Sequence, residues 1–167
     1  MKKIGIFYGS TTGTTHEVAD KIAEKLNVDS ADIYDVADCA PSDVAPYDLL
    51  VLGSSTWGDG ELQEDWQSFI DGLEQLDLSG KEIAIFGVGD ETMSDTFCNA
   101  VGELYHRLQK TGAKFVAPFN ADGYDFAHTG ADVDGVIVGL VLDNVNHEEL
   151  TDKRIDQWCK EVETYLH

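Results

Sequence analysis

Three segments of the sequence combine residue types that bind small ligands, and each follows an apolar run. The first segment consists of Ser10, Thr11, Thr12, Gly13, Thr14 and Thr15. Hydroxyl groups and the backbone N–H groups of a helix N-terminus bind anions, and a helical pattern begins directly after this segment. It contains no Lys or Arg, and Thr14 follows Gly13 where a nucleoside-triphosphate loop requires Lys. The segment therefore favours one terminal phosphate held by hydrogen bonds, with a capped helix start as the alternative.

The second segment places an indole among hydroxyls and glycines. It consists of Ser55, Thr56, Trp57, Gly58, Asp59 and Gly60. An exposed indole can stack on a flat aromatic ligand, and glycines on either side of Asp59 allow the peptide after Trp57 to turn. The alternative is a Trp that anchors this loop to the core.

The third segment, which begins with Gly87, Val88, Gly89 and Asp90, opens like a dinucleotide-binding motif. It lacks the third glycine of that motif and does not follow the first strand, so the dinucleotide interpretation fails. Its glycines allow the backbone to approach a ligand closely, and its N–H groups can face acceptors on a ring. A helix start capped by Ser94 or Asp95 is the alternative.

The elements that must position these segments alternate between strands and helices. Hydrophobic periodicity predicts strands over residues 3–8, 32–36, 48–53, 82–87, 114–119 and 136–142. It predicts helices over residues 16–26, 65–76 and 97–110, and a last helix that begins at Thr151 as N-cap and continues through Leu166. Trp66, Phe69 and Trp158 lie on helix faces expected to be core.

Apolar strands separated by amphipathic helices predict a single α/β domain over residues 1–167, a doubly wound parallel sheet with helices on both faces. Ligands of such sheets bind beyond the carboxyl ends of the strands. The three segments follow the first, third and fourth major strands, so we expect them to converge at that edge. Together they fit a flat aromatic mononucleotide with a single phosphate.

The charge and cysteine content exclude several classes. Eleven basic and 32 acidic residues give a net charge of −21, which disfavours nucleic-acid and anionic-membrane partners. Three cysteines without a C-x-x-C motif, together with the absence of a long apolar leader, lead us to expect a reduced, cytoplasmic protein. The histidines form no ligand cluster, so we predict no metal site.

These motifs together resemble those of the long-chain flavodoxins. The resemblance rests on Thr12-Gly13-x-Thr15, on Thr56 to Gly60, on Gly87-x-Gly89-Asp90 with Phe97 to Ala100, and on Gly123 to Phe126 with Gly139 to Asp143. It implies a flavodoxin-like, five-stranded sheet in the order 2-1-3-4-5, with the fifth strand interrupted by an insertion over residues 120–135. It also implies noncovalent FMN and low-potential one-electron transfer through the semiquinone/hydroquinone couple, without an enzymatic activity.

The chain departs from the family pattern at two positions. Thr14 stands where the family usually has Asn, and it keeps a hydrogen-bond donor. No Tyr or Trp occurs between Asp90 and Phe97, and Met93 falls at the position of the aromatic residue that covers the outer flavin face. We expect the Met93 thioether to pack on the ring instead. Cys98 is a further candidate near the flavin, with a packed thiol as the alternative.

The acidic residues suggest how such a carrier works. Negative groups around the flavin disfavour its anionic, fully reduced form and so lower the potential of the second electron. A Gly58–Asp59 peptide that rotates toward flavin N5 is expected to stabilise the one-electron form. Asp59, Glu61, Glu64 and Asp65 form the expected docking rim for a basic patch on a flavodoxin reductase or an oxidoreductase. We expect a monomer.

Two other functions remain as alternatives. A quinone reductase with this fold would need a substrate pocket over the flavin, for which the missing aromatic residue leaves some room. A receiver-type signalling domain would need an Asp at the end of the third strand, where this chain has Leu52, Gly53 and Ser54. The fold alone does not separate these functions, whereas the site residues do.

Overall fold

The computed structural model describes residues 3–9, 14–57, 61–62, 64–89, 99–118, 132–133, 136–143 and 148–165. The strands are β1 (Ile4–Gly9), β2 (Ile33–Asp35), β3 (Leu49–Trp57), β4 (Glu61–Leu62), β5 (Glu82–Gly89), β6 (Lys114–Phe115), β7 (Asp132–Val133), β8 (Val136–Ile137) and β9 (Leu140–Asp143). The α-helices are α1 (Thr14–Leu26), α2 (Glu64–Leu73), α3 (Asn99–Leu108) and α4 (Glu148–Glu163). Short 3-10 turns cover Ser30–Asp32, Pro41–Val44 and Gln109–Thr111.

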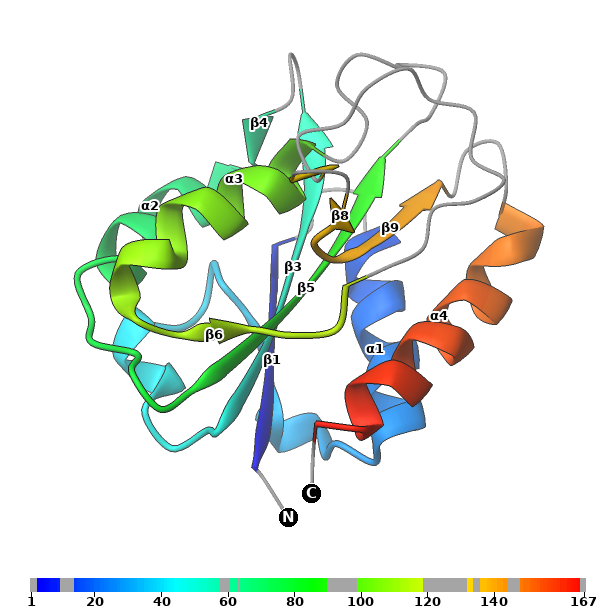
Figure 1. The fold of residues 1–167 in the computed structure, drawn as a ribbon, viewed down its shortest axis with the longest axis horizontal. Coiled ribbons are helices and arrows are strands. Elements are labelled where there is room, and N and C mark those ends of the chain that lie inside the picture. Colours follow the sequence, from blue (N-terminus) through cyan, green and yellow to red (C-terminus); the bar gives the residue numbers. More distant parts are fainter. Residues whose placement is uncertain are drawn as a thin grey trace.

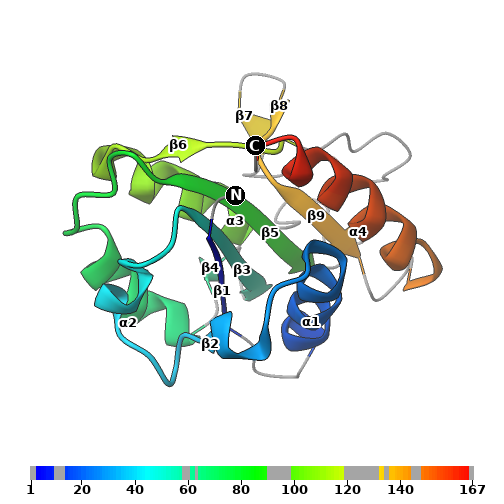
Figure 2. The same cartoon turned by 90° about the horizontal axis from the view of Figure 1, so that it is seen from below.

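The predicted doubly wound sheet is confirmed. The main path runs β2-β1-β3-β5-β6, and all of its pairings are parallel. Helices α1 and α4 cover one face, and α2 and α3 cover the other (Figures 1 and 2). Because every strand on this path points the same way, the carboxyl ends lie together at one edge and the amino ends at the other.

Burial on both faces explains why β1 and β3 read as continuous apolar runs. Successive side chains point to opposite faces: Phe7 joins the cluster that contains Trp66, whereas its neighbour Ile6 joins the cluster that contains Trp158. The side chains of Trp66, Phe69 and Trp158 are all at most 3% exposed, so the core positions predicted for them are confirmed.

The fifth strand position is divided between two segments. β6 pairs with Glu82 and Ile83 at the start of β5, and β9 pairs with Phe86 to Gly89 at its end. The interruption expected from the resemblance is therefore present. One detail was wrong: residues 136–142 do not form one strand, because β8 pairs antiparallel with β7 and only β9 joins the main sheet.

Other boundaries differ from the predictions for local reasons. Thr151 lies inside α4 and is buried, so its prediction as an N-cap was wrong. The helix begins at Glu148, where two consecutive acidic residues suit the positive end of the helix dipole. β3 extends through Trp57 instead of ending at Gly53, because β4 pairs with its last residues.

Gly53 in the central strand β3 must lack a side chain, because a neighbouring aromatic ring lies very close to it. Gly53 lies opposite Phe86 of β5, and a Cβ built on Gly53 would overlap the Phe86 ring. The ring is fully buried, so it has little room to move.

We therefore expect Gly53→Ala to lower the free energy of unfolding by about 2 kcal/mol through overpacking. Urea unfolding of the protein without ligand measures this loss. Combining the substitution with Phe86→Leu makes room for the new methyl group, so the double variant should lose less than the sum of the two single losses. Simple additivity of the two losses would contradict this explanation.

Candidate functional site

The candidate site lies at the carboxyl edge of the sheet, where three neighbouring strands end. Gly9 of β1 pairs with Ser54 of β3, and Ser54 pairs with Gly87 of β5. The three strands therefore end at the same, carboxyl edge, as expected from parallel topology, and β3 and β5 continue past the level of Gly9 to Trp57 and Gly89. Of the predicted site residues, the following lie outside the described residues: Ser10, Thr11, Thr12, Gly13, Gly58, Asp59, Gly60, Asp90, Met93 and Cys98.

The first segment ends in the first turn of α1. Thr14 opens this helix, and Thr15 follows it with a side chain that is 1% exposed. The Thr15 Oγ1 atom has no hydrogen-bond partner among the residues that the structure describes. A buried hydroxyl without a partner is costly, and this one lies at the end of a helix that favours anions. Thr15 thus fits the predicted phosphate position.

The second segment begins as a strand rather than as a loop. Ser55, Thr56 and Trp57 complete β3, and Thr56 and Trp57 pair antiparallel with Leu62 and Glu61 of β4. The backbone around Trp57 is thus set by a short β ladder that projects beyond the main sheet (Figure 1). Gly58 and Gly60 dominate the local sequence pattern, which predicts a loop, whereas the strand continues through Trp57.

The third segment also begins inside a strand. Val88 and Gly89 are the last residues of β5, and Val88 is buried. Val88 pairs with Ser55 on one side and with Leu142 of β9 on the other. The second and third segments are therefore held next to each other by sheet pairing before either leaves the sheet.

A stacked pair beside the first segment was not anticipated. The ring of His16 stacks on Tyr8, with 4.8 Å between centroids and 11° between planes, and His16 Nε2 lies 3.4 Å from Asp20 Oδ2. Burial raises the pKa of the Tyr8 phenol, and Asp35, Asp20 and Asp38 raise it further, so Tyr8 stays neutral at physiological pH. The sequence carries a signal for this pair: Tyr8 ends the predicted strand before the hydroxyl-rich segment, and His16 begins the predicted helix after it.

The described thiols are protonated at neutral pH. Burial is the largest cause that raises the pKa of Cys39 to about 11, and nearby carboxylates add to it. Burial likewise raises the pKa of Cys159 to about 12. Nucleophilic thiol chemistry is therefore not supported at either cysteine.

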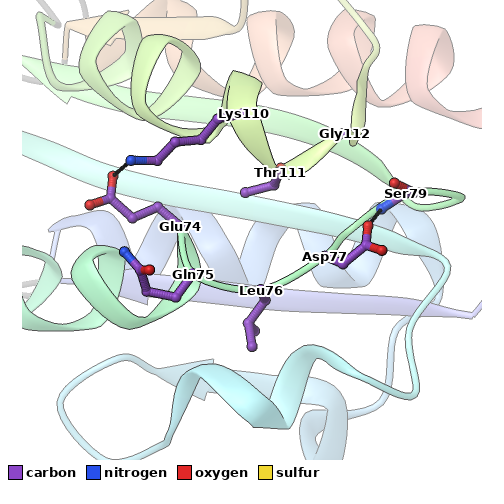
Figure 3. A pocket seen from close by; sticks show the side chains of 8 residues that line it. All are labelled: Glu74, Gln75, Leu76, Asp77, Ser79, Lys110, Thr111 and Gly112. Carbon is purple, nitrogen blue, oxygen red and sulfur yellow. Dashed lines mark hydrogen bonds and ion pairs between the residues drawn. The ribbon is translucent and has the colours of Figure 1, made fainter.

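A hollow of about 390 Å³ lies at the opposite, amino edge of the sheet. Figure 3 shows its lining, in which Glu74 faces Lys110 and Asp77 faces Ser79. The Glu74 carboxylate accepts two hydrogen bonds from Arg107, at 3.1 and 3.0 Å, and lies 3.4 Å from Lys110 Nζ. These contacts lower the pKa of Glu74, with the Arg107 hydrogen bond as the largest cause. Glu74 and Lys110 therefore neutralise each other, whereas the Asp77 carboxylate accepts a hydrogen bond from the Ser79 N–H at 3.0 Å.

Two features are absent from the described residues. No group of three or more His, Cys, Asp or Glu side chains within the described ranges could hold a metal ion. Among the helices in these ranges, none combines the length and apolar character required to cross a bilayer.

Comparison with known proteins assigns the family. The flavodoxin family model matches residues 6–158. The chain belongs to the flavodoxin family. A flavodoxin from Synechocystis is 39% identical over 168 residues, which cover 99% of each chain, and flavodoxin 1 of Escherichia coli is 40% identical over 100% of this chain and 96% of its own. A Fusobacterium nucleatum flavodoxin bound to flavin mononucleotide superposes with a TM-score of 0.90 at 31% identity, covering 100% of both chains. The flavodoxin resemblance read from the sequence is confirmed.

The unpartnered hydroxyl of Thr15 gives a prediction for the protein without ligand. Thr15→Val replaces a buried polar group with a methyl group of similar size, so the free energy of unfolding should rise by about 1 kcal/mol. Thr111→Val is the matched control, because the buried Thr111 hydroxyl donates a hydrogen bond to the Leu108 carbonyl. Thermal or urea unfolding should show the control losing stability. A loss of stability in Thr15→Val would show that its hydroxyl is already satisfied.

Proposed function

We propose that this flavodoxin-family chain binds FMN noncovalently at the carboxyl edge and carries electrons, one at a time, between redox proteins. The observation that carries the proposal is the parallel pairing of Gly9 with Ser54 and of Ser54 with Gly87, which brings the ends of β1, β3 and β5, and with them the three predicted binding segments, to one edge of the sheet. Family membership supports it, as does the flavin mononucleotide bound by the Fusobacterium nucleatum relative. FMN, when bound, supplies the redox chemistry, and the chain supplies binding, orientation and electrostatics.

The described residues fit a phosphate that is held by a hydroxyl group and by backbone dipoles rather than by positively charged side chains. Thr15 offers a buried hydroxyl, and the α1 N-terminus offers backbone dipoles. The end of β3, where Trp57 lies, and the end of β5, where Gly89 lies, would lie beside the ring, because the two paired strands end at the same edge of the sheet. This arrangement orients the ligand from the chain's own elements and does not require a metal ion.

Stepwise reduction tests the proposal. Purified protein mixed with FMN should become yellow and retain the colour through gel filtration. During anaerobic titration with a reductant, an absorption band at long wavelength should appear and then disappear, because the two electrons enter separately. Protein that stays colourless would contradict FMN binding. Direct conversion without an intermediate band would contradict the one-electron role.

The positive charges are placed mainly at the edge away from this site. Lys25, Arg107 and Lys160 lie in the last turns of α1, α3 and α4. Helices in this topology run opposite to the strands, so these last turns lie at the amino edge of the sheet. Several of these cations are already paired with acids there, including Lys25 with Asp156 at 3.3 Å. These cations are therefore far from the carboxyl edge, in a chain whose net charge is −21.

This asymmetry supports a partner with a basic patch, such as a flavodoxin reductase or another oxidoreductase. The predicted docking rim consists of Asp59, Glu61, Glu64 and Asp65, of which Asp65 is half-buried at the start of α2. Opposite charges accelerate encounter without requiring tight binding. Such transient contact suits a carrier that must leave one partner before meeting the next.

Removing charge from the rim should slow encounter with such a partner. We expect Glu61→Gln with Glu64→Gln to lower the second-order rate of reduction by a flavodoxin reductase about two- to fivefold at low ionic strength. The control, Glu161→Gln with Glu163→Gln, removes the same formal charge from the far end of α4. Stopped-flow rates of the two variants should converge as salt is added. Equal slowing by both pairs would indicate a net-charge effect and contradict a docking rim.

We also propose that the chain is a carrier rather than an enzyme, and that it is a monomer in the cytoplasm. The described thiols Cys39 and Cys159 are free, which suits a reducing compartment. Steady-state turnover of a quinone with a nicotinamide, in the absence of any reductase, would favour the quinone reductase alternative instead.

A further inference from the structure

A second hollow, of about 440 Å³, lies between α2 and the segment that follows β2, and we call it the β2 hollow. Its lining includes three residues from each side: Val36, Cys39, Pro41, Asp65, Ser68 and Phe69. The two sides are in contact where α2 packs against the 3-10 turn at Pro41–Val44 (Figure 2). Because β2 ends and α2 begins at the carboxyl edge, the β2 hollow lies on the flank of the candidate site.

The β2 hollow has a closed base and an open, polar mouth. Val36 and Phe69 are 4% and 3% exposed, so the base belongs to the packed core. Ser68 is exposed on α2, and Asp65 and Cys39 are half-buried. A volume of about 440 Å³ exceeds that of any single side chain. The shape therefore suits a long side chain that buries its stem and keeps a polar end among polar groups.

The charge around the β2 hollow is negative and is not balanced locally. The sequence contains no Lys, Arg or His between Lys25 and Lys81, whereas this stretch contains thirteen Asp and Glu residues. It includes β2, both sides of the β2 hollow and the whole of α2. A cation that enters the β2 hollow therefore meets no positive side chain from the elements that form it.

Three carboxylates lie within electrostatic reach of the Cys39 side of the β2 hollow. After burial, which is the largest cause, Asp43, Asp35 and Asp38 raise the pKa of the Cys39 thiol. Asp35 and Asp43 each accept a backbone N–H from their own segment at 2.9 Å, which fixes their positions. The ion pairs that the described residues form all involve other acids. These three carboxylates thus keep their charge available for a partner.

We propose that the β2 hollow receives an arginine side chain of the basic redox partner. This inference rests on the proposed carrier function, and it adds a shaped anchor point to the docking rim. A guanidinium group donates hydrogen bonds in several directions and is less strongly hydrated than an ammonium group, so it suits a partly buried polar hollow. A second copy of this chain is disfavoured as the occupant, because two chains of charge −21 repel each other.

A small probe tests the β2 hollow without any partner protein. The ¹⁵N-labelled protein is titrated with N-acetyl-arginine amide and, separately, with N-acetyl-citrulline amide, which has nearly the same shape without the charge. We expect the arginine compound to shift the backbone amide signals of residues 36–41 and 65–69 in a saturable way, and the citrulline compound to leave them unchanged. Equal shifts with both compounds, or small unsaturable shifts spread over all acidic surfaces, would overturn the proposal.

Two pairs of variants test the role of the β2 hollow in docking. Ser68→Phe fills it without changing the charge, and Gln67→Phe adds the same ring at an exposed position of α2 outside its lining. We expect Ser68→Phe to abolish the arginine-dependent shifts and to lower the second-order rate of reduction by a flavodoxin reductase about threefold, with Gln67→Phe close to wild type.

The second pair removes charge and keeps the shape. Asp38→Asn with Asp43→Asn should weaken binding of the arginine compound about threefold, because two of the three nearby carboxylates are lost. The control is Asp29→Asn with Asp48→Asn, which removes the same formal charge just before β2 and β3, at the amino edge. Equal weakening by both double variants would indicate an effect of net charge and would overturn the proposal.

The outcomes separate failure of the β2 hollow from failure of the proposed function. A wild-type protein that no reductase reduces would contradict the carrier function, and with it the assignment of a redox partner to the β2 hollow. Normal reduction of the wild type, with equal rates for Ser68→Phe and Gln67→Phe, would overturn the anchoring role and leave the carrier function in place.

Discussion

The register of β1, β3 and β5 is the constraint on which the site depends. Parallel pairing of Gly9 with Ser54, and of Ser54 with Gly87, places the carboxyl ends of the three strands at one edge of the sheet. A slip of one residue in any strand would turn its side chains to the opposite face, and the alternating burial of Ile6 and Phe7 opposes such a slip. The same packing that stabilises the core thus aligns the site.

The fold also determines where the positively charged side chains lie. Cations in the last turns of α1, α3 and α4 complement the helix dipoles and lie far from the carboxyl edge. The net charge of −21 disfavours additional negative charge on a ligand bound at the carboxyl edge. The placement of these cations thereby serves helix stability, and the net negative charge favours a low potential for the second electron.

Most of the fold could be predicted from the sequence, because strands buried on both faces and amphipathic helices leave distinct patterns. The errors arose where pairing or capping overrides local pattern: β3 continues through Trp57 because β4 pairs with it, and α4 begins before Thr151. In the site, Thr15 was predicted as a phosphate ligand from its hydroxyl and position alone. The hydrogen bond from Trp66 Nε1 to the Gly53 carbonyl could not be predicted, because helical spacing identifies Trp66 as a core residue but does not identify the partner of its N–H group.

The crystal structure of the protein with FMN tests the central claim most directly. The account predicts that the phosphate contacts Thr15 Oγ1 and the N-terminus of α1, and that the ring lies against the ends of β3 and β5. The flavin bound instead at the amino edge, in the hollow beside Glu74 and Lys110, would contradict it.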